Sequence, residues 1–375
     1  MGRVAVARHD GTAVIAITKH GATLARDLAA RLPGARLILS DKFRHIGGAA
    51  AEYYSGPLSA RIGAWFQTYD QLIFHVSLGA VVRLIAPHLQ SKETDPAVLV
   101  IDDAGRFVIS VLSGHVGGAN AYTEEVARAI GATPVITTAS DVGQTIPVDI
   151  LGRELGWQVD PATHGHITRV SAAVVNEEPV AFVQETGERG WWTRDTPLPR
   201  SITLYDSLDG VPDTAAAILW VTDRVPAGPA WERIAPRTVI YRPRSLVLGL
   251  GCDKGASRET LLEAIYKALE GAALSLMCVR GVATIDAKRN EPGLRALCDE
   301  MDWDFVTYPA AQLAAVPDIP NPSDVVLKYM GTPAVGEPAA MLSAGVGPGG
   351  LVVEKLKYKG ADDLNATVSV ARVAF

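Results

Sequence analysis

Ser113-Gly-His-Val-Gly-Gly-Ala-Asn120 is the stretch of sequence that decides the fold of this chain. The apolar run Phe107-Val-Ile-Ser-Val-Leu112 precedes it, and its β-branched residues predict a buried strand. After it, apolar residues recur at helical spacing from Tyr122 to Ile130, and Gly131 is placed to end that helix. A buried strand, a Gly-rich turn and an amphipathic helix in this order predict an α/β fold.

The Gly-rich turn is a candidate anion-binding site. A turn between a buried strand and a helix start gathers backbone N–H groups at the positive end of the helix dipole. Its glycines would let a ligand approach the backbone closely, with an imidazole (His115) and an amide (Asn120) beside it. The binding residues predicted in the turn are Ser113, Gly114, Gly117 and Gly118. The alternative is a tight connection whose histidine donates to a backbone carbonyl, and the spacing alone leaves both interpretations open.

Length and composition define the class of protein. At 375 residues the chain exceeds one hydrophobic core, and 48% hydrophobic with 20% charged residues is ordinary for a soluble globular protein. No apolar run approaches the ~20 residues of a membrane helix, and the start does not resemble a signal peptide. The net charge of −6 argues against a nucleic-acid partner but permits a small polyanionic ligand. Three cysteines without a C-x-x-C pair predict a reducing cytoplasm.

We predict two α/β sandwich-like domains with mostly parallel sheets, joined by a small irregular middle domain. Residues 1–144 form the N-terminal α/β domain, which opens as β-α-β and contains a hairpin of strands 97–101 and 107–112. Residues 145–243 form the middle domain, whose Pro-, Gly- and Trp-rich segments resemble connections. Residues 244–375 form the C-terminal α/β domain.

Three local expectations bear on these domains. Asp149–Leu155 has the pattern of a helix, and Ala339–Ser343 that of a strand in the C-terminal sheet. Ser257 is placed to cap a helix whose apolar residues recur at helical spacing up to Leu269.

A second helix start, Ser77-Leu-Gly-Ala-Val-Val-Arg83, offers further N–H groups. Ser77 is placed as its N-cap, and Gly79 lies in its first turn. Arg83 is able to hold a carboxylate through two parallel hydrogen bonds. The alternative for Arg83 is a solvated surface side chain.

The turn Gly251-Cys-Asp-Lys-Gly255 places Lys254 near a helix N-terminus, where it would meet a carboxylate, although a bare turn fits equally well. Together with Gly249 it invites a dinucleotide-binding interpretation. The third glycine is one position too late and no acidic residue ends the next strand, which disfavours NAD. His164-Gly-His166 has no carboxylate or thiol at supporting spacing, so we predict no metal site.

Four segments together resemble the cobalt-precorrin-5A hydrolase (CbiG) family of anaerobic cobalamin biosynthesis. They are His75-Val-Ser-Leu-Gly-Ala-Val-Val-Arg83, Asp95-Pro-Ala-Val-Leu-Val-Ile-Asp102, Leu112-Ser-Gly-His-Val-Gly-Gly-Ala-Asn120 and Thr137-Thr-Ala-Ser-Asp141. The region with Leu248-Gly-Leu-Gly-Cys252 and Glu354-Lys-Leu-Lys357 is similar to the family's C-terminal domain. The resemblance implies an enzyme that opens the δ-lactone of a contracted corrinoid ring and releases acetaldehyde, giving cobalt-precorrin-5B. It implies no cofactor, because the substrate carries the cobalt.

For that reaction we assign roles to the candidate residues. His115 is the general base, toward water or toward the substrate hydroxyl during carbon–carbon cleavage, and Asn120 orients the lactone carbonyl or the water. N–H groups around Gly117–Gly118 and Gly79–Ala80 stabilise the oxyanion. The cations expected to hold the peripheral carboxylates of the corrinoid are Arg83, Lys92 and Lys254. We place this active site at the carboxyl ends of the first sheet.

Two other functions stay open. A non-catalytic corrinoid or tetrapyrrole carrier or chaperone of the same pathway would bind the same ligand without releasing acetaldehyde. An NAD-dependent oxidoreductase is disfavoured by the broken glycine pattern. Beyond the small-molecule corrinoid, we name other cobalamin-pathway enzymes and a second copy of the chain, as a homodimer, as candidate partners; membrane association is not expected.

Overall fold

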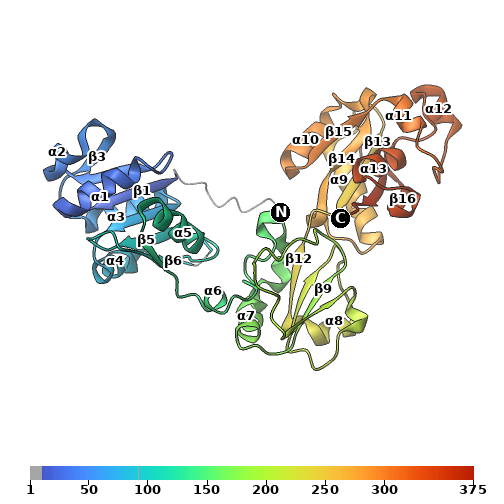
Figure 1. Cartoon of the computed structure of the whole chain (residues 1–375). Helices are drawn as coiled ribbons and strands as arrows, with labels where there is room; N and C mark the ends of the chain where they lie inside the picture. The colour runs from blue at the N-terminus through green and yellow to red at the C-terminus, as the bar shows by residue number, and fades with distance from the viewer. Residues whose placement is uncertain (1–10, 92) are drawn as a thin grey trace. The chain divides into compact units, whose positions relative to one another are not determined.

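The computed structural model describes residues 11–91 and 93–375 (Figure 1). Three sheets with mostly parallel strands and flanking helices confirm the predicted α/β class. Contacts divide the chain into two compact units, one ending at Ile150 and one formed by Leu151–Phe375. The domain limits predicted after residues 144 and 243 remain predictions. None of the helices within the described ranges is long and apolar enough to cross a membrane.

The first unit is built on a seven-stranded sheet with the strand order β3-β2-β1-β4-β5-β6-β7. Its strands are β1 (Thr12–Ala16), β2 (Arg36–Ser40), β3 (Ala51–Tyr54), β4 (Gln71–His75), β5 (Ala97–Ile101), β6 (Phe107–Leu112) and β7 (Thr133–Val135). Its helices are α1 (Lys19–Ala29), α2 (Arg44–Gly47), α3 (Ser59–Thr68), α4 (Leu78–Ile85), α5 (Ala119–Ile130) and α6 (Ala139–Val142). Apolar residues of α1 and α5 pack on one face of the sheet, and those of α3 and α4 on the other.

One antiparallel pair determines where the loops of this sheet emerge. All neighbouring strands run parallel except β5 and β6, the hairpin that the sequence predicted. Because Leu112 pairs with Val98, β6 ends beside the start of β5. The Gly-rich turn after Leu112 therefore lies at the amino edge of the parallel strands. The helix α4 follows His75 at the opposite, carboxyl edge.

The middle of the chain is more regular than the sequence analysis expected, with a five-stranded sheet in the order β10-β9-β11-β12-β8. Its elements are β8 (Gln158–Val159), α7 (Ile167–Val175), β9 (Val180–Gln184), β10 (Ile202–Tyr205), β11 (Ala217–Val221), α8 (Pro229–Ile234) and β12 (Thr238–Arg242). Every residue of β9, β11 and β12 is buried. Strands buried on both faces have no alternating polar and apolar pattern, and the Pro- and Gly-rich segments beside them resemble connections. The sequence pattern therefore did not predict a sheet here. The helix expected at Asp149–Leu155 is reduced to the 3₁₀ turn Arg153–Leu155.

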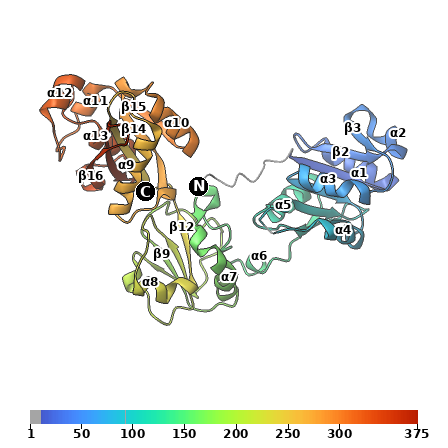
Figure 2. The same ribbon diagram turned by 180° about the vertical axis from the view of Figure 1, so that it is seen from behind.

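The third sheet has the order β15-β14-β13-β17-β16. Its strands are β13 (Leu246–Cys252), β14 (Val279–Ile285), β15 (Asp304–Tyr308), β16 (Leu351–Lys359) and β17 (Asn365–Arg372). Its helices are α9 (Arg258–Gly271), α10 (Pro292–Met301), α11 (Ala310–Ala314), α12 (Asp324–Met330) and α13 (Gly336–Ala344). Apolar residues of α9 and α10 pack on one face of this sheet, and those of α11 and α13 on the other. Figure 1 and Figure 2 show the ribbon of these elements from opposite sides.

Two predictions for the third sheet have opposite outcomes. Ser257 caps α9 as expected, because its hydroxyl accepts the Thr260 N–H. The strand expected at Ala339–Ser343 is wrong, since these residues belong to α13. Residues 336–341 are all buried, so that helix has no polar face by which the sequence could reveal its period.

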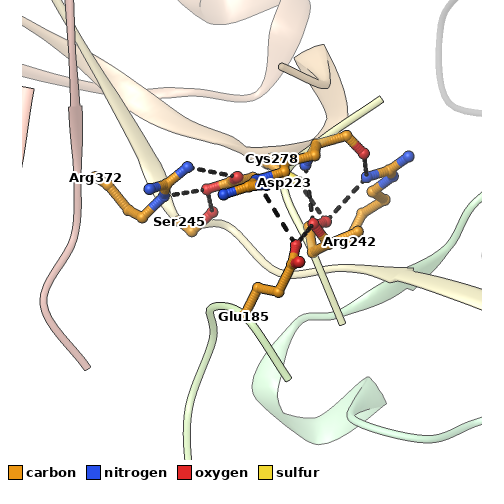
Figure 3. A network of polar contacts seen from close by, with 8 residues as sticks. Glu185, Asp223, Arg242, Ser245, Cys278 and Arg372 are labelled. Atoms are coloured by element: carbon orange, nitrogen blue, oxygen red, sulfur yellow. Dashed lines mark hydrogen bonds and ion pairs between the residues drawn. The ribbon is translucent and has the colours of Figure 1, made fainter. Parts of the chain in front are cut away.

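A buried ionic network joins the middle and third sheets within the second unit (Figure 3). Asp223, which follows β11 and is 1% exposed, accepts hydrogen bonds from Arg372 Nε and Nη2 at 2.6 and 2.8 Å. Ser245 Oγ donates to the same carboxylate at 3.2 Å. A buried carboxylate must be paired to be tolerated, so this network is a specific joint between the two sheets.

Gly249 is explained by packing and not by a nucleotide. A Cβ at this position of β13 would collide with the carbonyl oxygen of Gly336, at the start of α13. The missing side chain lets the helix backbone lie directly against the strand. The first glycine of the suspected dinucleotide pattern therefore serves the core.

We predict that Gly249→Ala destabilises the second unit by about 1–3 kcal/mol or more, because backbone must move to accommodate the methyl group. Gly271→Ala is the matched control: its Cβ would meet no atom within 4 Å, and a helical alanine is favoured over glycine by about 0.5–1 kcal/mol. Urea unfolding of the two full-length variants, followed by circular dichroism, measures both. Equal midpoints would contradict the packing role of Gly249.

Candidate active site

His115, on the loop after β6, lies between two carboxylates. Its Nδ1 lies 2.9 Å from Asp149 Oδ1, and its Nε2 lies 3.1 Å from Asp141 Oδ2. The Ser140 hydroxyl oxygen is also 3.1 Å from Nε2. The imidazole is 13% exposed, Asp149 18% and Asp141 29%, so the cluster is partly open to solvent on the Asp141 side.

The two carboxylates control the charge and the tautomer of the imidazole. The hydrogen bond to Asp149 raises the pKa of His115, and the charges of Asp149 and Asp141 add to this effect, whereas burial opposes it. A carboxylate accepts only, so Nδ1 donates its proton to Asp149, and in the imidazolium form, which the raised pKa favours, Nε2 donates to Asp141. The Nε2 atom is then the one that gains or loses a proton, next to Asp141 and Ser140.

Asn120 holds the second segment of the site in place. Its side-chain N–H groups donate to Thr138 Oγ1 at 2.8 Å and to Asp141 Oδ2 at 2.7 Å, and its carbonyl oxygen accepts from Ser110 Oγ. The residue is 7% exposed. The prediction that Asn120 belongs to the site stays a proposal, but its contacts favour positioning Asp141 over touching a substrate.

Three backbone N–H groups at the end of the Gly-rich turn are hydrogen-bonded within the turn, so they do not contribute to the predicted anion cradle. The N–H groups of Gly118, Ala119 and Asn120 donate to carbonyl oxygens within the turn, those of His115, Ser113 and Gly114. The Gly118 N–H is thus used inside the turn, and the oxyanion role predicted for the N–H groups around Gly117–Gly118 remains a proposal that rests on Gly117.

The small residues of the turn serve its own packing. A Cβ on Gly114 would lie 2.8 Å from Asn120 Oδ1, and one on Gly117 would collide with Ser113. Ser113 has a positive φ of 56°, and its hydroxyl donates to the carbonyl oxygen of Asp95. Their predicted substrate-binding roles remain proposals.

The structure does not bring the second predicted helix start to the turn. Ser77, Gly79 and Arg83 lie at the carboxyl edge of the sheet, about 15 Å away along β4 if each of its five residues spans ~3.3 Å. Ser77 occupies the N-cap position of α4 without a side-chain cap, and the Ala80 N–H donates to the Ser77 carbonyl. Arg83 Nη1 donates to the Gly79 carbonyl at 2.8 Å. Lys92 lies outside the described residues.

The predicted position of the active site is also corrected. The candidate site lies at the amino edge of the first sheet, not at the carboxyl ends of its strands. The imidazole at the carboxyl edge is His75. It is 2% exposed, burial lowers its pKa to about 4, and neither ring nitrogen has a hydrogen-bond partner among the described residues. A neutral imidazole shielded from solvent is a poorer proton carrier than His115.

Lys254 belongs to the second unit, which has a cavity of about 350 Å³ at the carboxyl ends of β13 and β14. Apolar residues of α12 and the start of α13 line it, but Lys254 does not. The lysines that line it are Lys288, paired with Glu291 at 3.1 Å, and Lys355.

Sequence reasoning missed Asp149, Ser140 and Asp141, the last of which was quoted only as the end of Thr137–Asp141. Asp149 lay in a segment expected to be helical, and Ser140 appeared only within Thr137–Asp141, quoted for its resemblance. No local pattern links either residue to His115, 34 and 25 positions away. They lie close to His115 because β7 runs parallel to β6 and therefore ends at the same edge of the sheet.

Comparisons with known proteins agree along the whole chain. Family models described as Cobalamin synthesis G N-terminal, Cobalamin biosynthesis central region and Cobalamin synthesis G C-terminus match residues 61–141, 146–243 and 246–371. A cobalt-precorrin-5A hydrolase from Priestia megaterium is 42% identical over 97% of this chain and 95% of its own. One from Salmonella typhimurium is 31% identical over 94% and 96%. Protein CobE from Sinorhizobium sp is 36% identical over 27% of this chain and 66% of its own.

We predict that the pKa of His115 lies above 6.5 and that Asp149→Asn lowers it, because the amide removes one negative charge while burial remains. A folded-state pKa above the unfolded value stabilises the protein below pH 6.5, and this contribution is lost as pH rises through the folded pKa. Asp149→Asn should therefore cost more stability at pH 5.5 than at pH 8.5. NMR titration of labelled histidines and melting at both pH values measure this. The control is Glu124→Gln on the exposed side of α5. If both variants changed the His115 pKa and the pH dependence of stability equally, the pairing of His115 with Asp149 would be contradicted.

Proposed function

The chain belongs to the cobalt-precorrin-5A hydrolase (CbiG) family, and we propose that it hydrolyses cobalt-precorrin-5A with His115 at the reacting centre. It is a hydrolase of cobalamin biosynthesis. The reaction opens the δ-lactone of the contracted corrinoid ring, releases a two-carbon unit as acetaldehyde and gives cobalt-precorrin-5B. The observation that supports this site is an imidazole held between Asp141 and Asp149 at a partly exposed edge of the sheet.

The geometry suits general-base catalysis. Opening a lactone requires a proton to be taken from the attacking oxygen and returned to the leaving oxygen. Asp149 accepts the Nδ1 proton of His115, which leaves the lone pair on Nε2 to take a proton. Both carboxylates then stabilise the imidazolium that forms. His115 is the proton carrier, and Asp149 and Asn120 are positioning residues.

The substrate is a flat ring with a rim of carboxylates, so it needs apolar walls and scattered cations. Lys254 remains a proposed carboxylate contact, although Lys355 and not Lys254 lines the cavity of the second unit. Arg83 and Lys92 remain proposals without structural support. The cobalt is part of the substrate, and we propose no other cofactor.

The binding partners and the cellular location are proposals. The relation to CobE and to other proteins of the cobalamin pathway supports a corrinoid ligand. Contacts with other enzymes of the pathway and a homodimer remain proposed, as does the cytoplasm, which rests on the sparse cysteines of the sequence.

The remaining alternative is a carrier or chaperone that binds the corrinoid without converting it. The purified chain incubated with cobalt-precorrin-5A and an acetaldehyde-detecting coupled assay separates the two. Acetaldehyde formed in proportion to enzyme supports the hydrolase, and binding without acetaldehyde supports the carrier.

We predict that His115→Ala and His115→Asn each lower kcat for acetaldehyde release by about 10²–10⁴-fold, because the proton carrier is lost. His164→Ala, an exposed histidine of the middle region, should keep wild-type turnover. Equal melting temperatures check that the variants fold. Wild-type turnover in both His115 variants would remove this imidazole from the chemistry.

A further inference from the structure

Ser140 is the hydroxyl nearest to the proton-accepting atom of His115. It lies in the short helix α6, which follows the capping position of Thr138, and its Oγ is 3.1 Å from His115 Nε2. Asp149 holds the opposite ring nitrogen at 2.9 Å. A hydroxyl, an imidazole and a carboxylate in this sequence of contacts are the signature of an activated serine, which is recognised by geometry and not by order in the chain.

We propose that Ser140 is the nucleophile that opens the lactone, with His115 as its base and Asp149 as the residue that orients the base. This inference rests on the proposed function and adds a covalent acyl-enzyme step to it. The lactone is an ester, and esters are the substrates that such a constellation cleaves without any cofactor.

The first half-reaction consumes the ester bond. Ser140 Oγ forms a bond to the lactone carbonyl carbon while His115 Nε2 takes the hydroxyl proton. The ring C–O bond then breaks, its electron pair stays on the departing oxygen, and His115 returns the proton to that oxygen. The products are an acyl-Ser140 ester and a free hydroxyl on the macrocycle.

The second half-reaction restores the enzyme. His115 takes a proton from water, the hydroxide adds to the acyl carbon, and Ser140 Oγ leaves with the proton that His115 returns. One water is consumed, a carboxylic acid is formed, and no oxidant or reductant is needed. The carbon–carbon cleavage that yields acetaldehyde follows lactone opening.

The surrounding groups favour Ser140 over the other nearby hydroxyls. Thr138 Oγ1 accepts from Asn120, and Ser113 Oγ donates to a backbone carbonyl. Asp141 shares Nε2 with Ser140, so it accepts the new N–H as soon as the serine proton has moved. Ser140 is 6% exposed and the Asp141 side chain beside it is 29% exposed, so the cluster is open to solvent on that side.

Kinetics test the proposal first. Ser140→Ala should lower kcat for acetaldehyde release by about 10³-fold or more, and the double variant with His115→Ala should lose little further, because groups that act as one unit are not additive. Ser140→Cys retains a nucleophile, and it should accumulate a substrate adduct that intact-mass spectrometry detects. Melting temperatures equal to wild type show that each variant folds.

Labelling tests the nucleophile without the substrate. A fluorophosphonate probe should modify Ser140 in the wild type, mapped by peptide mass spectrometry, and should fail to modify the His115→Ala variant. Two results together would overturn the assignment of Ser140 as nucleophile: turnover of the Ser140→Ala variant within about threefold of wild type, and no labelling of Ser140 in the wild-type protein. His115 would then remain as a base toward water. An inactive wild type would instead overturn the proposed function itself.

Discussion

The antiparallel pairing of β6 with β5 is the constraint on which the candidate site depends. It reverses the chain within an otherwise parallel sheet, so the Gly-rich turn emerges at the amino edge. The parallel pairing of β7 with β6 then brings the segment of Asp141 to the same edge. Had β6 joined the sheet in parallel, with β7 still parallel to it, the imidazole and its carboxylates would lie at the carboxyl edge instead.

Within that edge, backbone and side chains divide the work. The turn uses the N–H groups of Gly118, Ala119 and Asn120 internally and excludes a Cβ at Gly114, so its last part supports the start of α5. The chemistry that we propose depends on side chains from three segments: His115 from the turn, Asp141 from α6 and Asp149 from the end of the first unit. Two carboxylates on one imidazole make proton transfer to Nε2 favourable, which is the property that lactone opening needs.

The second unit depends on a different kind of joint. Asp223 is almost fully buried, and Arg372 and Ser245 from the third sheet satisfy it. Removing one member of such a pair typically costs about 3–5 kcal/mol, because an unpaired charge remains buried. The middle and third sheets are thereby held as one unit, and the cavity lined by Lys288 and Lys355 lies within it.

The sequence by itself determined three local features, namely the hairpin of β5 and β6, the end of α5 at Gly131 and the Ser257 cap. It also determined the α/β class and the family. The hairpin, the helix end and the cap each leave a signal within a few neighbouring residues, as turn chemistry or periodicity, and the family is marked by several such segments along the chain. Only the tertiary structure decided that α13 is a helix, that the middle region is a sheet, and that Asp149 and Ser140 meet His115. A fully buried element has no polar face to mark its period, and contacts between residues 25 or 34 positions apart depend on strand direction, which no local pattern encodes.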